Sequence, residues 1–447
     1  MRRHFLLLTI FVAFAYASIG QALLPSLDSL VSVYVKQRGF NGSVLVAQKG
    51  KVLLEKGYGY KDAAKRTMLD ENSIFQYGSI TKQFTSALVM YLQEKGKLNI
   101  NDKLSRYFPE LPFADSVTLY NLLTHTSGIY NYTNNGDFMK TEAVKPATRE
   151  KIFNLFDNKP LEFKPGTKFN YSNSGYSLLG YIIEKASGMP YEKLMRQVIL
   201  EPVGMKTAGF DYAHSTSADR TTGYNFINGD KFEAAGIVDS TVAYAAGSLY
   251  GSVKDLYAWH QALEKHALLS AASWQKVYTP FQSKYAMGWG IDSAYGKLVT
   301  QHGGGIFGYT SMIRRFPEDD VVVIVLSNNS SQYVGEIANN LSAIIFRQPI
   351  EWPKEHKFVK VAEEKLKAYV GEYEVGPNFI LKISVDNGML QAEPTGQPKT
   401  ELQAESEDTF YIAEADAQLV FEKDSAGKVT GARLIQQGRV NPIKKIK

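Results

Sequence analysis

The chain has 447 residues, which is long enough for two to three domains with large hydrophobic cores. Its composition, 44% hydrophobic and 21% charged, is that of an ordinary globular protein and excludes a low-complexity chain. The formal net charge is +5 and Lys and Arg form no run, which argues against nucleic acid as a partner. Cysteine is absent, so neither a disulfide nor a lipid-attachment cysteine is available.

Residues 1–22 are predicted to be a secretory signal peptide. Arg2 and Arg3 give a basic start, and the apolar run that follows is shorter than the ~20 residues of a membrane span. Small residues precede two possible cleavage points, after Ala22 or after Ala17. We therefore expect a secreted protein that has no stable membrane anchor once the signal is removed.

Residues 26–346 are predicted to form the first domain. A short amphipathic helix over 26–38 precedes two strands, 42–48 and 52–58, which a Lys-Gly-Lys turn joins into a hairpin. A longer helix starts at Ser79 and ends in a basic last turn followed by a glycine.

Ser79 and Lys82, in the segment QYGSITK, are the first candidate catalytic pair. A spacing of three residues places both on one helical face, so the Lys82 amine can reach the Ser79 hydroxyl. A serine becomes a useful nucleophile when a neighbouring base takes its proton, and a helix N-terminus stabilises a developing anion. The pattern S-x-x-K also occurs at Ser273 and Ser425, so the motif alone is weak. Ser79 differs in having a glycine before it and a long helix after it.

Tyr171 and Asn173 are the second candidate pair. Side chains two residues apart in an extended loop point the same way and can share one cavity. A tyrosine can shuttle a proton when a nearby cation lowers its pKa, and an asparagine can hold a substrate carbonyl. The segment Tyr132–Asn134 repeats the spacing, and either segment alone is more simply a polar loop.

The third candidate segment is His302-Gly303-Gly304-Gly305. Three successive glycines cost backbone entropy, so they call for a reason. One reason is the close approach of an edge strand to a ligand, with a backbone N–H offered to an oxyanion. The other is a tight turn into the next strand. The histidines show no H-E-x-x-H pattern, so neither a metal nor a cofactor is predicted.

The remaining elements complete two domains. A helix-rich segment covers about 100–240, and strands return at 309–316 and 321–326, so one sheet combines strands from both ends of the first domain. Two further helices are expected near 241–266 and at 334–346. A linker with two prolines is expected over 347–361, followed by a small β-barrel or sandwich over 362–447.

Taken in order, S-x-x-K, Y-x-N and H-G-G resemble the serine β-lactamase and penicillin-binding protein superfamily. The resemblance is strongest to its class C-like branch, with carboxypeptidases, D-aminopeptidases and esterases, and the segment LLTHTSG at 122–128 adds to it. It implies an α+β fold: an antiparallel sheet flanked by helices, an all-helical subdomain, and a small all-β domain appended at the C-terminus. The bacterial character of the family places a secreted member most simply in the periplasm.

The resemblance also implies roles. Ser79 would be the acylated nucleophile, Lys82 and Tyr171 a coupled base and proton shuttle, and Asn173 a substrate-positioning residue. The N–H groups of Ser79 and Gly305 would form the oxyanion hole.

His302 and Gly303 occupy the substrate-binding places where family members that process penicillins often carry a lysine and a hydroxyl residue. The departure indicates a substrate less anionic than a penicillin.

Two functions follow from this reading. The leading one is a serine hydrolase that acts through an acyl-enzyme on small-molecule or peptide substrates with an ester or amide bond, D-amino-acid peptides and β-lactam-like compounds included. The alternative is a penicillin-binding-type protein that acylates slowly and senses cell-wall fragments without efficient turnover. An α/β-hydrolase is disfavoured because no G-x-S-x-G occurs. The oligomeric state stays open.

Overall fold

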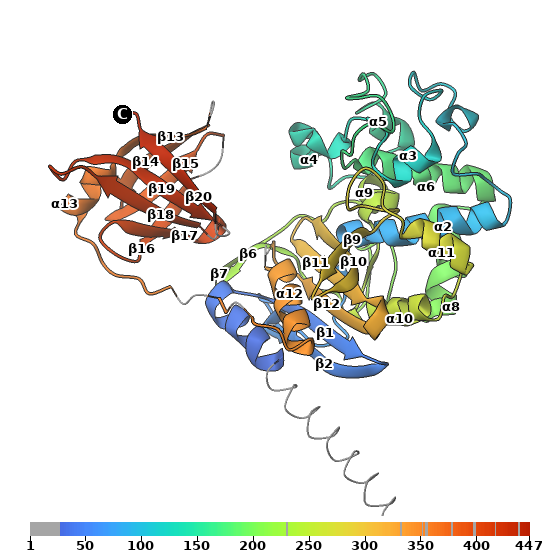
Figure 1. Ribbon diagram of the computed structural model, residues 1–447, viewed down its shortest axis with the longest axis horizontal. Helices are drawn as coiled ribbons and strands as arrows, with labels where there is room; N and C mark the ends of the chain where they lie inside the picture. Colours follow the sequence, from blue (N-terminus) through green and yellow to red (C-terminus); the bar gives the residue numbers. More distant parts are fainter. Residues whose placement is uncertain are drawn as a thin grey trace, which may run out of the picture. The chain divides into compact units, whose positions relative to one another are not determined.

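The computed structural model describes residues 27–228, 231–330, 333–350, 352–353, 356–376, 379–396, 399–415, 417–436 and 439–447. The predicted signal peptide over 1–22 lies outside these residues. The chain forms two compact units, Met1–Pro353 and Lys354–Lys447, which are taken separately below (Figure 1). The boundary falls within the range 347–361 predicted as a linker. None of the described helices combines the length and the apolar character of a membrane span.

A six-stranded antiparallel sheet is the centre of the first unit, in the order β2-β1-β12-β11-β10-β9. Its strands are β1 (Gly42–Gln48), β2 (Lys51–Tyr58), β9 (Gly290–Ala294), β10 (Lys297–Ile306), β11 (Tyr309–Phe316) and β12 (Val321–Ser327). The pairing of β1 with β12 joins the two ends of the unit, as predicted.

Helices cover both faces of this sheet, which explains why β12 is an unbroken run of buried aliphatic residues. Val321, Val323 and Val325 pack with the helix over 27–38 and with α12 (Val334–Ile345). The alternate residues of β12 face α2 (Thr81–Glu94) and α10 (Val253–Glu264) in a second core (Figure 1). The predicted sheet with helices on both faces is confirmed.

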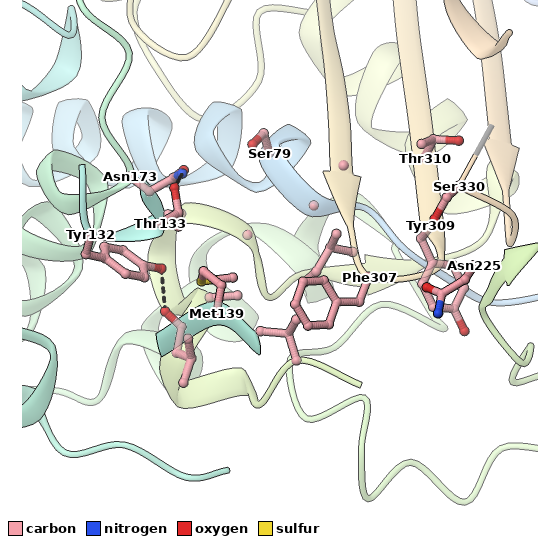
Figure 2. Close-up of a pocket in the computed structure, with 18 residues that line it drawn as sticks. Ser79, Tyr132, Thr133, Met139, Asn173, Asn225, Phe307, Tyr309, Thr310 and Ser330 are labelled. Atoms are coloured by element: carbon pink, nitrogen blue, oxygen red, sulfur yellow. Dashed lines mark hydrogen bonds between the residues drawn. The ribbon is translucent and has the colours of Figure 1, made fainter. Parts of the chain in front are cut away.

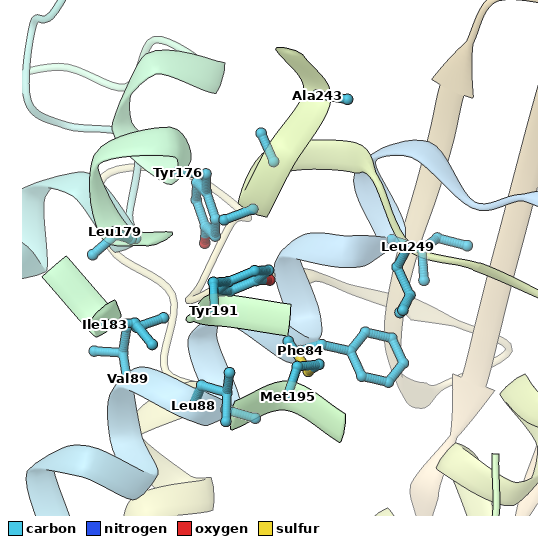
Figure 3. Packing of buried hydrophobic residues seen from close by; sticks show 14 of the residues in the cluster. Phe84, Leu88, Val89, Tyr176, Leu179, Ile183, Tyr191, Met195, Ala243 and Leu249 are labelled. Carbon is cyan, nitrogen blue, oxygen red and sulfur yellow. The ribbon is translucent and has the colours of Figure 1, made fainter. Parts of the chain in front are cut away.

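A helical region packs against α2, and in Figure 3 Phe84, Leu88 and Val89 meet side chains of the helices α6 and α7. Full burial of each large apolar side chain contributes roughly 1.5–3 kcal/mol. The remaining helices of the unit are α3 (Leu119–Leu123), α4 (Gly136–Thr141), α5 (Arg149–Phe153), α6 (Asn173–Ser187), α7 (Tyr191–Met195), α8 (Glu201–Val203), α9 (Ser240–Gly247) and α11 (Ala271–Val277).

One β-hairpin interrupts the region expected to be helical. Its strands are β6 (Tyr224–Asn228) and β7 (Lys231–Ala234). Tyr224 and Ile227 of the hairpin are buried in a small cluster with Ala63, whereas Phe226 and Phe232 are exposed. The other short strands are β3 (Tyr60–Asp62), β4 (Thr67–Met68), β5 (Phe75–Gln76) and β8 (Tyr250–Gly251).

The second unit is a closed antiparallel barrel in chain order, β13 to β20. Alternate residues such as Leu381 and Ile383 fill its interior, and a turn at Asn387 and Gly388 with positive φ reverses the chain. The β-barrel is thus the form that the predicted all-β domain takes. Its elements are α13 (Glu363–Leu366), β13 (Gly371–Gly376), β14 (Phe379–Asp386), β15 (Met389–Pro394), β16 (Thr400–Ala404), β17 (Thr409–Ile412), β18 (Ala417–Lys423), β19 (Val429–Gln436) and β20 (Arg439–Lys445).

Candidate active site

Ser79 lies in a 3-10 turn, Gly78–Ile80, that leads directly into α2. Gly78 has φ +57°, a conformation that favours glycine. The turn places Ser79 at the N-terminal end of a long buried helix, where unpaired N–H groups collect. The expected start of this helix at Ser79 is confirmed to within two residues.

The glycine run of β10 lies against this turn. Strand β9 pairs with β10 only as far as Gln301, so the edge of β10 beyond it is open toward Ser79. A Cβ on Gly304 would lie 1.9 Å from the carbonyl oxygen of Tyr77, and one on Gly78 would lie 2.9 Å from the Gly305 nitrogen. The glycines therefore permit a close approach of an edge strand. The alternative of a tight turn at 303–305 is wrong.

Lys82 is fully buried, and its amine contacts three oxygen atoms. The Nζ lies 2.8 Å from the Asn173 Oδ1, 2.8 Å from the Ala246 carbonyl oxygen and 3.0 Å from the Ser79 Oγ. Burial lowers the pKa of Lys82 well below its usual value, so the neutral amine is favoured. A neutral amine has two N–H groups for the two pure acceptors, which leaves its lone pair for the hydroxyl of Ser79.

Tyr171 lies beside this pair, with the Lys82 Nζ 4.8 Å from its ring centroid. Burial raises the pKa of Tyr171, and the nearby Ser79 hydroxyl offsets only part of that effect. The condition that a nearby cation lowers the pKa of this tyrosine is not met, because burial is the largest influence on that pKa and raises it. The raised pKa keeps the phenol neutral, and its buried Oη has no hydrogen-bond partner among the described residues.

His125 supports the loop that carries Tyr171. Its ring packs on the Tyr171 ring with centroids 4.1 Å apart, and its Nδ1 accepts the backbone N–H of Ser172 at 3.1 Å. Its carbonyl oxygen accepts the N–H of Asn170 at 2.9 Å, and its backbone has φ +54°. The segment LLTHTSG supported the family resemblance, but the sequence alone assigned no role to its histidine, His125. A histidine between two threonines just past a helix end was the available signal.

Asn173 is the first residue of α6, and a second loop fixes its side chain. Its Nδ2 donates to Thr133 Oγ1 at 3.0 Å, and its backbone N–H donates to Asn131 Oδ1 at 3.0 Å. The Oδ1 is thereby turned toward Lys82. Thr133 belongs to the segment Tyr132–Asn134, which repeats the Y-x-N spacing. This loop therefore helps to orient the Asn173 side chain.

His302 is buried beside the site, and its two ring nitrogens are both engaged. The Tyr285 hydroxyl lies 2.9 Å from Nε2, and the Gly303 carbonyl oxygen lies 2.6 Å from Nδ1. Burial and the neighbouring Lys82 lower the pKa of His302 to about 4. This ring is a neutral packing group, and neither His302 nor Gly303 is among the residues that line the cavity at Ser79. Their contact with substrate stays a prediction.

A cavity of about 560 Å³ opens in front of Ser79 (Figure 2). Among the described residues that line it, none is Lys, Arg, Asp or Glu. Apolar side chains dominate beside a few neutral polar groups, which is usual for a small-molecule site. The lining residues are Gly78, Ser79, Tyr132, Thr133, Met139, Asn173, Asn225, Val238, Val242, Ala243, Ala246, Gly247, Gly305, Ile306, Phe307, Tyr309, Thr310 and Ser330.

One group of potential metal ligands lies elsewhere, at His260, Glu264 and Asp320. Arg315 already donates to His260 Nδ1 at 3.1 Å and to Glu264 at 2.6 Å, and the His260 Nε2 lies 3.0 Å from Asp320. The Arg315 guanidinium thus already binds two of these groups. The cluster is a partly buried ion-pair network that links α10 to the sheet.

Comparison with known proteins agrees with this geometry. A family model described as "Beta-lactamase" matches residues 27–343, and one described as "Domain of unknown function (DUF3471)" matches residues 355–441. The chain is 29% identical over 426 residues to penicillin-binding protein 4* of Bacillus subtilis (strain 168), covering 88% of this chain and 93% of that relative.

Two solved structures extend the comparison. The octameric penicillin-binding protein homologue from Pyrococcus abyssi has a TM-score of 0.64 and 26% identity, covering 94% of this chain and 99% of that one. The D-amino acid amidase from Ochrobactrum anthropi SV3 has a TM-score of 0.63 and 22% identity, covering 73% of this chain and 99% of that one. At that identity the amidase shows a shared fold alone.

Proposed function

The chain belongs to the β-lactamase and penicillin-binding protein family of serine hydrolases, and we propose that it hydrolyses esters or amides through an acyl-enzyme at Ser79. The observation that carries the proposal is the set of three contacts at the Lys82 amine. Two pure acceptors face its N–H groups, and burial lowers its pKa, so the unprotonated amine presents its lone pair to the Ser79 hydroxyl.

In the proposed acylation, the Ser79 Oγ attacks the substrate carbonyl carbon while Lys82 takes its proton. The carbonyl oxygen becomes an oxyanion, which the backbone N–H groups of Ser79 and Gly305 stabilise. The carbon–leaving-group bond then breaks, and the leaving group takes the proton of the Tyr171 phenol, which the Lys82 ammonium replaces. Water attacks the acyl-enzyme by the reverse proton path, which releases the acid and restores Ser79.

The substrate we propose is uncharged around its scissile bond. A carboxylate buried without a cation is strongly disfavoured, and the cavity lining offers no such cation. Neutral esters and amides, including those of D-amino-acid peptides, fit this lining better than an anionic β-lactam. Residues 1–22 support secretion, with the periplasm as the proposed location.

The test uses the purified mature protein and a Ser79→Ala variant, each assayed with a chromogenic ester and a chromogenic cephalosporin. We expect steady ester turnover that the variant loses and little turnover of the cephalosporin. A single burst without steady turnover would replace the proposal with the acylating sensor. Ester turnover that survives in Ser79→Ala would overturn the assignment of the nucleophile.

A further inference from the structure

The cavity at Ser79 has two chemically different ends. In Figure 2, Tyr132 and Met139 lie on the helical side, while Asn225, Thr310 and Ser330 lie together on the side of the sheet. The last three come from β6, β11 and the segment after β12. They are brought together because Tyr224 accepts the backbone N–H of Ser330 at 3.0 Å. We call Asn225, Thr310 and Ser330 the polar end of the cavity.

The orientation of the Asn225 amide leaves its oxygen as an available acceptor at this end. Its Nδ2 donates to the Glu233 carboxylate of β7 at 3.0 Å. A carboxylate only accepts hydrogen bonds, so the NH₂ group must face it and the Oδ1 remains available for a ligand. Thr310 behaves in the same way, because its hydroxyl donates to the Asn329 carbonyl oxygen at 3.1 Å. Its remaining capacity is also that of an acceptor.

The negative charge of Glu233 beside the polar end also favours a cationic group there. Glu233 is exposed at the rim, 3.0 Å behind the Asn225 amide, and a negative charge there attracts a cation and repels a carboxylate. Lys231 lies two residues earlier on the same strand, and no ion pair with Glu233 is among the described contacts. No lysine or arginine is among the described residues that line the cavity.

We propose that the polar end is a subsite for a primary ammonium group carried by the substrate, so that the enzyme favours amine-bearing over carboxylate-bearing esters and amides. The inference rests on the proposed hydrolase function and names the substrate class of that site. Asn225 and Thr310 accept hydrogen bonds from the ammonium, and Glu233 supplies the opposite charge.

The test compares matched p-nitrophenyl esters whose unbranched acyl chain of four or six carbons ends in an ammonium, a methyl or a carboxylate group. We expect kcat/KM to fall in that order for at least one chain length. Glu233→Gln should lower the ratio of kcat/KM for the ammonium ester to kcat/KM for the methyl ester by about three-fold, the size of an exposed charge pair. Added salt should shrink the same advantage.

Lys231→Gln is the matched control, because it removes the opposite charge from the same hairpin. It should raise or preserve the preference for the ammonium ester. General damage to the hairpin would instead lower kcat/KM for all three esters together. Equal rates for the ammonium and carboxylate esters at both lengths would overturn the subsite and leave the hydrolase function standing.

A binding measurement keeps the subsite testable if none of the esters is turned over. Ser79→Ala would be titrated with N-methyl-6-aminohexanamide and with N-methylheptanamide by NMR. Tighter binding of the amine that Glu233→Gln weakens supports the subsite. Binding of the amine no tighter than that of the neutral amide overturns it.

Discussion

The imidazole of His125 packs on the ring of Tyr171, with the two ring centroids 4.1 Å apart. Its Nδ1 accepts the N–H of Ser172, so this one side chain fixes both the ring and the backbone of the loop. His125 is not among the described residues that line the cavity. We therefore assign it a positioning role, which acts through the orientation of Tyr171.

Two substitutions at His125 separate its two contacts. Asparagine places an acceptor near the position of Nδ1 and tolerates a positive φ, but it removes the ring under Tyr171. We expect His125→Asn to fold and to lose about ten-fold in kcat with little change in KM, because Tyr171 is less well held. Phenylalanine keeps a ring but leaves the Ser172 N–H unpaired, which costs about 1–3 kcal/mol of unfolding free energy. Steady-state kinetics and urea unfolding measure the two effects, and wild-type kcat in His125→Asn would refute the positioning role.

The opposite pKa shifts of Lys82 and Tyr171 predict which of them is the base. Because burial lowers the pKa of Lys82 and raises that of Tyr171, the amine loses its proton first as pH rises. We expect kcat/KM to increase with pH through that step. Tyr171→Phe should lower kcat about 100-fold, the contribution of a proton donor, and leave the midpoint of this rise in place.

A substitution of Lys82 gives a second test of the assignment of Lys82 as the base. Lys82→Met should abolish the rise itself along with most activity. His125 and His302 also face Lys82 and are held neutral, so a further loss at more acidic pH can come from them. Disappearance of the main rise in Tyr171→Phe, with the rise intact in Lys82→Met, would make the tyrosine the base.

The close approach of β10 to the Ser79 turn predicts a sharp difference between adjacent glycines. A Cβ on Gly304 would lie 1.9 Å from the Tyr77 carbonyl oxygen and 3.1 Å from the Ser79 nitrogen, both backbone atoms that cannot move aside. Gly304→Ala should therefore push the strand away and reduce kcat at least 100-fold, as does loss of an oxyanion donor.

Gly303→Ala is its control, because the nearest atom to that added Cβ is the flexible Met312 Cε at 3.4 Å. We expect this variant to keep most of its activity and its stability. Equal losses in the two variants, measured as kcat with one ester, would mean that the strand is not held against the nucleophile.

The regular elements could be predicted because hydrophobic periodicity reports them directly. Strands β11 and β12 and the end of α2 lie within one residue of the sequence prediction. The unbroken aliphatic run marks β12, and the Lys95-Gly96 terminus marks the end of α2. The hairpin of β6 and β7 was missed because, of its described residues, it buries only Tyr224 and Ile227, three residues apart, while Phe226 and Phe232 are exposed, so no alternation of a strand marks it.

The candidate site likewise has features that the sequence predicts and features that only the structure shows. Spacing predicted the Ser79–Lys82 contact, because helix geometry fixes such a short-range relation, whereas the meeting of this pair with Tyr171 and Asn173 was implied by the family resemblance. The direction of the Tyr171 pKa shift and the seclusion of His302 depend on how deeply each group is buried, which spacing does not report. The polar end of the cavity joins three segments distant in sequence, and only the folded chain brings them together.

The seclusion of His302 predicts a loss of stability in acid. Its pKa of about 4 lies below the usual histidine value near 6.5, because burial and Lys82 oppose its charged form. Between these two pH values the unfolded state binds more protons, so the unfolding free energy falls as pH drops from about 6.5 to 4, by roughly 3 kcal/mol from this residue. Glutamine can still accept from the Tyr285 hydroxyl but does not titrate. His302→Gln should therefore reduce the fall in unfolding free energy over this range, measured by urea unfolding at each pH. Part of the fall should remain, because burial also lowers the pKa values of His125 and His260. The exposed control His214→Gln should follow the wild-type curve. An unchanged slope in His302→Gln would mean that this ring is charged in the folded protein or is not buried.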